Sequence, residues 1–252
     1  MANGEESAFV DAMASSDDIV VLTGAGISTL SGIPDFRSPG GAYDKDFRGM
    51  RVEEILSIGF FRQHPEIFYE WCKNVWYRLD DYKPNVVHEC LSLLERQGRI
   101  RAIYTQNIDM LHQRAGSRKV YELHGSPAHN RCMNCGKDFP YDDVAPVVRA
   151  GDVPHCDKCG GVLKPDIVLY GEGLDGDVLN RAFEDFSNAA LCLVLGTSLT
   201  VSPAGSLPGL SVRSGHKLAI VNASDTFMDS AADFRLRDLK ASFEALERRI
   251  SV

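Results

Sequence analysis

Four cysteines with metal-ligand spacing are the strongest chemical signal in this sequence. They form two Cys-x-x-Cys pairs separated by twenty residues, Cys132 with Cys135 and Cys156 with Cys159. Each pair places two sulfurs on one tight turn, and a glycine after each pair lets that turn adopt positive φ. Two such turns can surround one tetrahedral zinc ion, whose four protein ligands would leave no position open for catalysis. The spacing therefore predicts a structural zinc site, with two redox dithiols as the alternative.

A second chemical signal is the glycine-rich turn Gly24-Ala25-Gly26, which follows the apolar, β-branched run Ile19–Thr23. Such a run is typical of a fully buried strand. A Gly-x-Gly turn between a strand and a helix places backbone N–H groups against a pyrophosphate. The third glycine of the dinucleotide fingerprint would fall at Thr29, and no acidic residue stands at the usual ribose distance. The turn alone therefore also fits a plain strand-to-helix connection.

Polar or glycine-containing clusters follow five expected strands, at residues 24–28, 105–109, 124–125, 196–198 and 222–224. In open α/β sheets, ligands bind at the edge where the carboxyl ends of the strands lie. Each cluster alone also fits an ordinary turn or, between residues 107 and 109, a helix N-cap. Together the five clusters predict one binding cleft at that edge.

The elements that must position these clusters alternate between short apolar strands and helices. This alternation predicts an α/β fold with a mainly parallel, Rossmann-like sheet that carries helices on both faces. The cysteine-rich segment is expected to interrupt it as an insertion, and residues 39–65 to be rich in loops. Strands are expected at 19–23, 100–105, 120–123, 167–170, 191–195 and 217–221, and helices at 5–16, 65–79, 84–97, 177–187 and 239–250.

Composition and charge exclude several classes of protein. The 252 residues are 44% hydrophobic, so the chain can bury a core and is not intrinsically disordered. The formal net charge of -8 argues against direct binding of nucleic acid, and no apolar run reaches the ~18 residues of a membrane span. The start of the sequence lacks the basic residues of a signal peptide, and the remaining cysteines stand in apolar contexts. We therefore expect a reducing, cytoplasmic location; the oligomeric state is not indicated.

Several short motifs occur in a fixed order along residues 19–240. On these motifs the sequence resembles the sirtuin family of NAD-dependent protein-lysine deacylases, and it is most similar to the compact microbial members. The motifs are Gly24-Ala-Gly-Ile-Ser28, Gly32-Ile-Pro-Asp-Phe-Arg37, Thr105-Gln-Asn-Ile-Asp109, His124-Gly125, the four paired cysteines, Gly171-Glu172, Gly196-Thr-Ser198 and Val221-Asn-Ala-Ser224.

The resemblance implies two domains. A Rossmann-like large domain that binds NAD would comprise residues 1–38, 84–125 and 165–252. A small domain would combine a helical module at 39–83 with a zinc-ribbon module at 126–164. NAD and an acyl-lysine peptide or protein would enter the cleft between the two domains from opposite sides.

The resemblance also implies catalytic roles. His124 would be the general base, because an imidazole with a pKa of ~6.5 can remove a proton near neutral pH. It would deprotonate a ribose hydroxyl that attacks the acyl carbon. Asn107 would orient the ribose or a bound water, and Gln106 would face the ribose hydroxyls. Ile108 and Asp109 would lie beside the nicotinamide.

Further cofactor contacts are implied in the loops that follow the strands. The glycine-rich turn would meet the pyrophosphate. Phe36, on a mobile loop, would cover the reactive ribose carbon, and the loop after residue 221 would face the adenosine ribose. The full set is Gly24, Ala25, Gly26, Ser28, Thr29, Asp35, Phe36, Arg37, Gly196, Thr197, Ser198, Asn222, Ser224 and Leu239.

The acyl-lysine peptide is expected to lie along a strand that contains Val168, Tyr170, Gly171 and Glu172. Val168 would offer its carbonyl to the acyl-lysine amide, and Tyr170 would form an apolar wall. A departure from the family pattern is Lys164, which stands where arginine is common, close to the peptide cleft.

The activity implied is removal of acetyl or longer apolar acyl groups from protein lysines. The products would be nicotinamide, O-acyl-ADP-ribose and free lysine. Sirtuins that remove acidic acyl groups carry a tyrosine and an arginine three residues apart, whereas Tyr69 is here followed by Cys72, so a buried carboxylate would lack a partner. The alternative activity is protein ADP-ribosyl transfer from the same NAD site.

Overall fold

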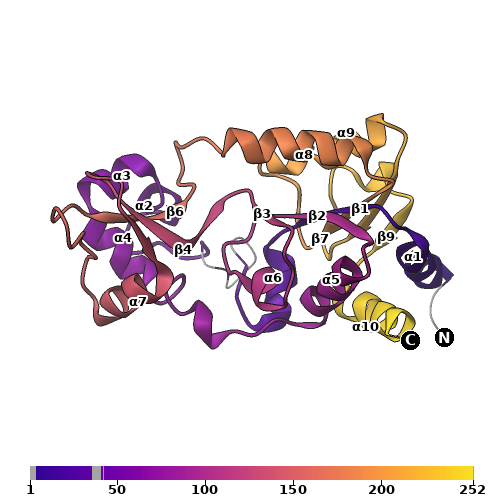
Figure 1. Ribbon diagram of the computed structural model, residues 1–252, viewed down its shortest axis with the longest axis horizontal. Helices are drawn as coiled ribbons and strands as arrows, with labels where there is room; N and C mark the ends of the chain where they lie inside the picture. Colours follow the sequence, from indigo (N-terminus) through magenta and orange to yellow (C-terminus); the bar gives the residue numbers. More distant parts are fainter. Residues whose placement is uncertain (1–3, 36–40, 42, 252) are drawn as a thin grey trace.

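The computed structural model describes residues 4–35, 41 and 43–251. Figure 1 shows two lobes along the longest axis, a large one built on a sheet and a smaller one that holds α2, α3, α4 and α7. Both chain termini lie at the far end of the large lobe. Among the described residues, no helix combines the length and the apolar character that a membrane span requires.

The large lobe is built on six parallel strands in the order β3-β2-β1-β7-β8-β9. The first three and the last two strands expected from the sequence fall here within one residue at each end, whereas β9 was not predicted. The predicted parallel sheet is thus confirmed. The strands are β1 Ile19–Thr23, β2 Ile100–Thr105, β3 Val120–Glu122, β7 Leu191–Leu195, β8 Lys217–Val221 and β9 Phe234–Leu236.

Side chains of β1 alternate between two apolar cores, because successive residues of a strand face opposite sides. Ile19 and Val21 pack into the core beneath α1, α5 and α10. Val20 and Leu22 pack into the core beneath α8 and α9, on the opposite face (Figure 1). Both faces are covered, which explains why the strand has no polar side until Thr23. The helices are α1 Gly4–Ser15, α5 Val86–Arg96, α8 Gly176–Asn188, α9 Pro208–Arg213 and α10 Leu239–Ile250.

The small lobe has one core of its own, shared by the helical module and the cysteine-rich segment. Phe68 and Trp76 of the helical module pack in the same cluster as Val144, Cys132 and Leu163. An antiparallel sheet in the order β5-β4-β6 carries the cysteine-rich segment. The elements are α2 Val52–Ile55, α3 Ile58–Gln63, α4 Pro65–Cys72, α7 Tyr141–Ala150, β4 Gly125–Cys132, β5 Asp138–Pro140 and β6 Leu163–Ile167.

The predicted helix at 65–79 was too long, since α4 ends at Cys72. The N–H groups of Val75 and Trp76 both donate to the Cys72 carbonyl, at 3.0 and 2.8 Å, so the chain tightens into turns. This brings Trp76 edge-on against Trp71, with ring centroids 5.3 Å apart. Burial of these aromatic side chains therefore overrides the helical periodicity of the sequence.

The strand expected at 167–170 is also wrong in its bounds, because β6 ends at Ile167. Gly125 of β4 pairs with Ile167, and beyond that point the chain leaves the sheet. The N–H of Val168 donates to the His124 carbonyl (2.9 Å), and the N–H of Tyr170 donates to the Leu56 carbonyl (2.9 Å). Residues 168–170 thus link the two lobes through backbone hydrogen bonds outside the named strands, and Tyr170 forms an isolated parallel bridge with Ser57.

Several elements were not predicted, most of them segments of three to seven residues that show little periodicity. The turn after β1 enters a 3₁₀ helix rather than an α-helix. Residues 141–150, expected only as part of the cysteine-rich module, form α7. The other short elements are α6 Leu111–Arg114 and the 3₁₀ helices Ala25–Ser31, Leu79–Asp81, Ala204–Ser206 and Asp229–Ala231.

Two buried histidines lie beneath the binding edge of the sheet. The rings of His88 on α5 and His112 on α6 have centroids 4.9 Å apart, and His112 Nε2 lies 3.0 Å from Thr23 Oγ1. Burial lowers the pKa of His88 to about 4 and that of His112 well below 6.5. Both rings are therefore neutral in the folded protein at pH 7.

We predict that these histidines destabilise the fold as the pH falls from about 6.5 towards 4. The unfolded chain takes up protons at a pKa of ~6.5 while the folded chain does not, which lowers the free energy of unfolding. For His88 alone the loss at pH 4 is on the order of 3 kcal/mol. Urea unfolding at several pH values checks this, with His88→Gln expected to flatten the slope and exposed His64→Gln to leave it unchanged. Equal slopes in wild type and His88→Gln would contradict the prediction.

Candidate active site

The polar clusters meet at one edge of the large sheet. In the parallel register, Thr23 of β1 lies beside Thr105 of β2 and Leu195 of β7, so the residues that follow these strands are neighbours. Gly24 N donates to the Leu195 carbonyl at 2.9 Å, and Gln106 N to the Thr23 carbonyl at 2.9 Å. The predicted convergence of these clusters is thus found.

The glycines at this edge allow two backbones to approach closely. A Cβ on Gly24 would lie 2.6 Å from Thr197 Cβ, and one on Gly26 would lie 2.8 Å from Gly196 Cα. Gly196 has a φ of 59°, and a Cβ there would meet Ile27 N at 2.5 Å. Side chains at these positions are therefore excluded, and the turn is fixed as a bare backbone surface. Ala25 and Thr29 lie on the 3₁₀ helix that this turn begins.

A chain of hydrogen bonds orients Asn107 and Asp109. Asn107 Nδ2 donates to Ser28 Oγ (3.1 Å) and to the Gly24 carbonyl (3.1 Å). Ser28 Oγ in turn donates to Asp109 Oδ2 at 2.5 Å, and Asp109 Oδ1 accepts from Leu111 N. With both amide protons used, Asn107 presents Oδ1 as a buried acceptor that has no partner in the described part of the protein.

Burial shifts the pKa of the Asp109 carboxyl in this group. Asp109 is 5% exposed, and burial raises its pKa above the ordinary value, while the Ser28 hydrogen bond opposes that shift. Ile108 is also buried beside it. An unpartnered buried acceptor next to a carboxyl group fits a ligand that brings hydroxyl or amide donors, such as the ribose and nicotinamide halves of NAD.

His124 stands beside this network with its ring orientation set by the backbone. Its Nδ1 lies 3.0 Å from the Gln106 carbonyl. A carbonyl can only accept, so the neutral ring carries its proton on Nδ1 and leaves Nε2 as the basic nitrogen. Burial lowers the pKa of His124, which keeps the ring neutral at pH 7. The geometry therefore suits a general base.

Two further clusters complete the edge of the sheet. Gln106 Nε2 donates to Thr197 Oγ1 at 3.0 Å, and Ser198 Oγ lies 3.0 Å from Thr200 Oγ1. Asn222 Nδ2 donates to the Ser224 carbonyl at 2.8 Å on the far side of β7. The Gln106–Thr197 contact joins the ends of β2 and β7, and the hydrogen bond from Gly196 N to the Val221 carbonyl (3.0 Å) joins β7 to β8.

The remaining predicted cofactor residues are Leu239 and those of the loop after the first 3₁₀ helix. Leu239 opens α10 as a half-buried residue packed against the core beneath the sheet. Asp35 is half-buried and follows the 3₁₀ helix Ala25–Ser31. Phe36 and Arg37 lie outside the described residues, so their predicted roles stay predictions.

Hydrogen bonds and an ion pair of Glu172 hold the peptide-binding segment in place. Glu172 N donates to the Leu169 carbonyl, and Leu169 N donates back to Glu172 Oε2, both at 2.9 Å. Lys164 Nζ lies 2.9 Å from the same Oε2 and donates to the Ile167 carbonyl at 2.8 Å. Gly171, with a φ of 92°, allows the turn. This turn leaves Tyr170 exposed, and its role as an apolar wall stays a prediction.

The contacts to the helical module were missed in the sequence. Tyr170 exchanges two backbone hydrogen bonds with that module, to the Leu56 carbonyl and from Ile58 N. Neither residue carries a motif, since only their backbone atoms take part. The ion pair between Lys164 and Glu172 could have been suspected from their opposite charges and their spacing around a turn.

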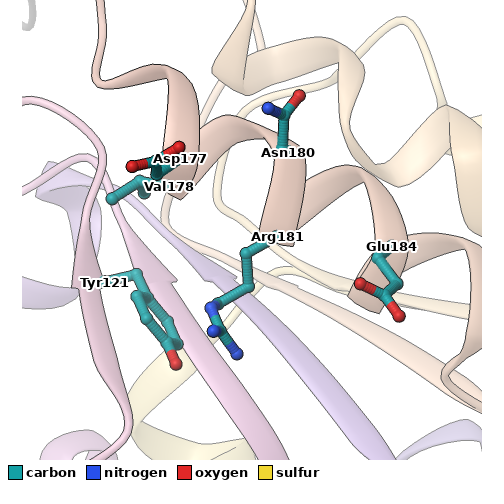
Figure 2. A pocket seen from close by; sticks show the side chains of 6 residues that line it. All are labelled: Tyr121, Asp177, Val178, Asn180, Arg181 and Glu184. Carbon is teal, nitrogen blue, oxygen red and sulfur yellow. The ribbon is translucent and has the colours of Figure 1, made fainter.

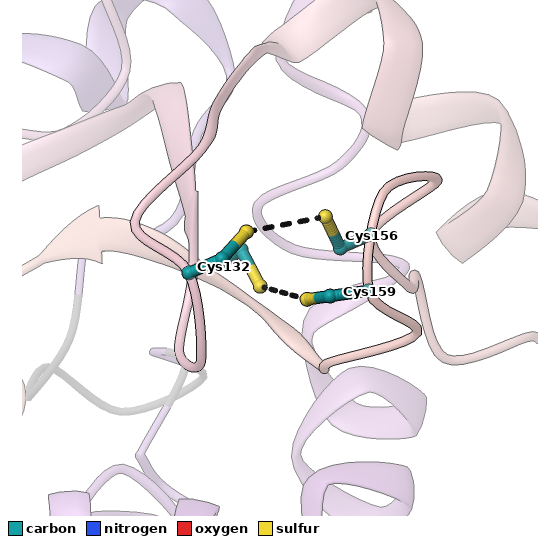
Figure 3. Close-up of side chains that lie close together, drawn as sticks. Cys132, Cys156 and Cys159 are labelled. Atoms are coloured by element: carbon teal, nitrogen blue, oxygen red, sulfur yellow. Dashed lines mark hydrogen bonds between the residues drawn. The ribbon is translucent and has the colours of Figure 1, made fainter.

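The four paired cysteines converge in the small lobe (Figure 3). Their sulfurs all lie within 4.8 Å of one another, with Cys132 and Cys159 sulfurs 3.4 Å apart and those of Cys135 and Cys156 3.7 Å apart. A tetrahedral zinc ion with ~2.3 Å bonds needs sulfurs ~3.8 Å apart, so the set fits. The backbone N–H of Cys135 lowers the pKa of Cys132 to about 6, which favours the thiolate. All four are free of disulfides.

A surface hollow of about 590 Å³ lies between β3 and α8, away from the residues described above (Figure 2). Arg181 lies over the ring of Tyr121, 5.4 Å from its centroid, between the carboxylates of Asp177 and Glu184. None of the predicted site residues lines it. We therefore place the active site at the strand ends and not in this hollow.

Comparisons with known proteins agree with this geometry. A model of the Sir2 family matches residues 24–203. An NAD-dependent protein deacetylase of Thermotoga maritima is 46% identical over 227 residues, which cover 90% of this chain and 90% of the relative. An NAD-dependent protein deacylase of Archaeoglobus fulgidus is 40% identical over 225 residues, which cover 89% and 87%.

Solved structures are similar as well. A Sir2 complex with a p53 peptide and NAD+ has a TM-score of 0.86 and 43% identity. A Sir2 homologue bound to a propionylated peptide has a TM-score of 0.85 and 42% identity. In both cases the match covers 96% of this chain and 97% of the other.

Proposed function

The chain belongs to the Sir2 family, and from this premise we propose that it removes acetyl and longer apolar acyl groups from protein lysines in an NAD-dependent reaction. It is an NAD-dependent protein deacetylase or deacylase with one structural zinc site. The observation that carries the proposal is the placement of His124 beside the Asn107–Ser28–Asp109 network at the edge of the sheet.

Different residues of the chain orient the cofactor, accept a proton and hold the peptide. NAD, when bound, supplies nicotinamide as leaving group and a ribose that receives the acyl group. Asn107 Oδ1 accepts a hydrogen bond from the ligand and so orients it. His124 Nε2 takes a proton from a hydroxyl in the site, since Nδ1 is held by the Gln106 carbonyl. Val168 and Tyr170 hold the peptide between the two lobes.

The test is mass spectrometry of one reaction. Purified protein is incubated with an acetyl-lysine or propionyl-lysine peptide, with and without NAD. We expect loss of the acyl group only with NAD, together with nicotinamide and acyl-ADP-ribose. A peptide or protein that instead gains ADP-ribose would support the alternative transferase activity. None of the similar proteins named above is named as a transferase of this kind. No NAD-dependent product with either acyl chain would overturn the proposal.

The pH profile of the reaction should show a limb set by His124. The neutral ring is the active form, and burial lowers its pKa below 6.5. The rate constant kcat/KM should therefore fall only as the pH drops below 6.5, and it should be flat from 6.5 to 8. Steady-state rates between pH 5 and 8 check this. A midpoint at or above pH 7 would contradict the lowered pKa.

The structure shows what Tyr69 and Cys72 contact, the two residues compared above with the tyrosine and arginine of sirtuins that remove acidic acyl groups. Tyr69, considered above as half of a site for acidic acyl groups, is 2% exposed and donates to the Leu163 carbonyl at 2.6 Å. Cys72 is wholly buried beside it, and burial raises the pKa of its thiol well above 9. This pair is thus core packing and offers no cation to a carboxylate.

Loss of Lys164 should weaken peptide binding more than catalysis. Its ammonium group is mostly buried and bonds to Glu172 and to the carbonyls of Pro165 and Ile167 in β6, directly before the peptide-binding segment. Lys164→Met leaves the Glu172 carboxylate without its ion pair and loosens the turn. We expect the peptide KM to rise about tenfold, with less than a twofold change in kcat and in the KM for NAD.

Steady-state kinetics with matched variants check this. Lys164→Arg should restore the peptide KM, because the guanidinium can reach the same acceptors. The exposed Lys158 provides a control, and Lys158→Met should behave as wild type. An unchanged peptide KM in a folded Lys164→Met protein would show that the ion pair does not position the segment.

We also propose that the protein works in the cytoplasm. Support comes from its seven free cysteines, three of them (Cys72, Cys90 and Cys192) buried in the cores, which suit a reducing compartment. Fractionation of cells that express the protein tests the proposal. Recovery outside the cytoplasmic fraction would overturn it.

A further inference from the structure

Two arginines of the edge strand β9 hold the loop that follows β8. Arg235 lies within β9 and Arg237 follows its last residue, so the two side chains leave the extended chain on the same side. The loop begins at Asn222, at the binding edge of the sheet, and runs to the 3₁₀ helix Asp229–Ala231.

Arg235 is the inner of the two and is only 15% exposed. It donates to the carbonyls of Asn222 and Ser224, both at 2.7 Å, and to that of Leu236. Its Nε lies 2.8 Å from Asp229 Oδ2 as an ion pair. One guanidinium thus ties together both ends of the loop and the strand.

Arg237 bonds to Ala223, the residue between Asn222 and Ser224. It donates to the Ala223 carbonyl at 2.9 Å and to Asp225 Oδ1 at 2.5 Å. The carbonyls of three consecutive residues, 222 to 224, therefore all accept hydrogen bonds from guanidinium groups.

This arrangement fixes the direction of the backbone N–H groups. In a planar trans peptide, the N–H points opposite to the carbonyl of the preceding residue. The N–H groups of Ala223, Ser224 and Asp225 therefore point away from the arginines. All three residues are exposed, and in the described part of the structure these N–H groups have no protein acceptor.

We propose that Arg235 and Arg237 are positioning residues, which hold residues 222–225 so that their N–H groups present donors to the hydroxyl oxygens of the adenosine ribose. The proposal rests on the proposed function and on the prediction from the sequence that the loop after residue 221 faces the adenosine ribose. The arginines themselves need not touch the cofactor, since the terminal nitrogens of each guanidinium donate to oxygen atoms of the loop.

An arginine is well suited to this task and a lysine is less so. Arg235 donates from Nη1 and Nη2 to the carbonyls at residues 222 and 224 while its Nε faces the Asp229 carboxylate. An ammonium group on a flexible stem cannot serve these acceptors in the same geometry. Arg235→Lys should therefore recover only part of the function, which separates the hydrogen-bond pattern from the charge.

The experiment measures steady-state kinetics of Arg235→Gln, Arg237→Gln and Arg235→Lys. We expect the KM for NAD to rise about tenfold in Arg235→Gln and about threefold in Arg237→Gln. The peptide KM and kcat should change less than twofold. Arg248→Gln, at an exposed position on α10, should match the wild type.

A purely structural role would give a different result. If a folded Arg235→Gln protein keeps the wild-type KM for NAD, or if both KM values rise equally, the proposal is wrong. Should Arg235→Gln fail to fold, Arg237→Gln decides, because that side chain is 62% exposed. If the wild type lacks NAD-dependent activity, the proposed function fails, and calorimetric binding of ADP-ribose to the same variants tests the positioning role separately.

Discussion

Replacing His124 with tyrosine should reduce NAD-dependent deacylation by about a thousandfold, within the ~10²–10⁴ range of general bases. The Gln106 carbonyl holds Nδ1, and burial keeps the ring neutral, so Nε2 is free to take a proton at pH 7. A phenol with a pKa of ~10 stays protonated at that pH and cannot replace it. Release of nicotinamide and loss of the acyl group, measured by mass spectrometry, report the effect.

The same variant must keep its fold for this result to identify a base. His124 is half-buried, so a ring of similar size should be tolerated, and thermal unfolding should shift by only a few degrees. His129→Tyr, at an exposed position on β4 five residues away, serves as the matched control with wild-type turnover. Deacylation by His124→Tyr within tenfold of the wild type would remove His124 from the mechanism.

The parts predicted well from the sequence are those that depend on local patterns. A buried strand such as β1 needs apolar residues on both faces, so Ile19–Thr23 is legible as a strand without knowledge of its neighbours. The parallel sheet then places the residues after each strand at one edge, which is why Gly24, Gln106 and Gly196 meet there. The zinc site followed from spacing alone, because two tight turns can present four sulfurs in few ways.

The parts predicted poorly depend on contacts between distant segments. Helix α4 ends where Trp76 packs against Trp71, although the apolar spacing continues. Residues 168–170 leave the sheet because their N–H groups find acceptors at His124 and Leu56, on different lobes. The arginines on β9 carry no motif, and their role depends on backbone carbonyls that no sequence pattern reports.

Loss of zinc should have the largest effect on stability. The four sulfurs have the spacing of a tetrahedral site, and Cys132 and Cys156 lie within the apolar core of the small lobe. Structural zinc contributes about 10 kcal/mol or more to the folding of small zinc modules, comparable to the whole stability of ~5–15 kcal/mol of a typical domain. We therefore expect Cys132→Ser to abolish zinc binding and to unfold the small lobe.

The large sheet should survive this change, because its two cores contain none of the four ligands. Metal analysis of Cys132→Ser should find less than about one-tenth of an equivalent of zinc, because the missing thiolate opens the coordination sphere. Limited proteolysis should then cut within the small lobe first, and a chelator should reproduce the effect in the wild type. The control is Cys192→Ala, a buried thiol of the large lobe, which should lower stability by about 1–2 kcal/mol and keep its zinc. The helical module and the cysteine-rich segment share one core, so loss of a structural zinc should destabilise both. A metal-free Cys132→Ser protein that unfolds at the wild-type temperature would therefore contradict a structural role for zinc.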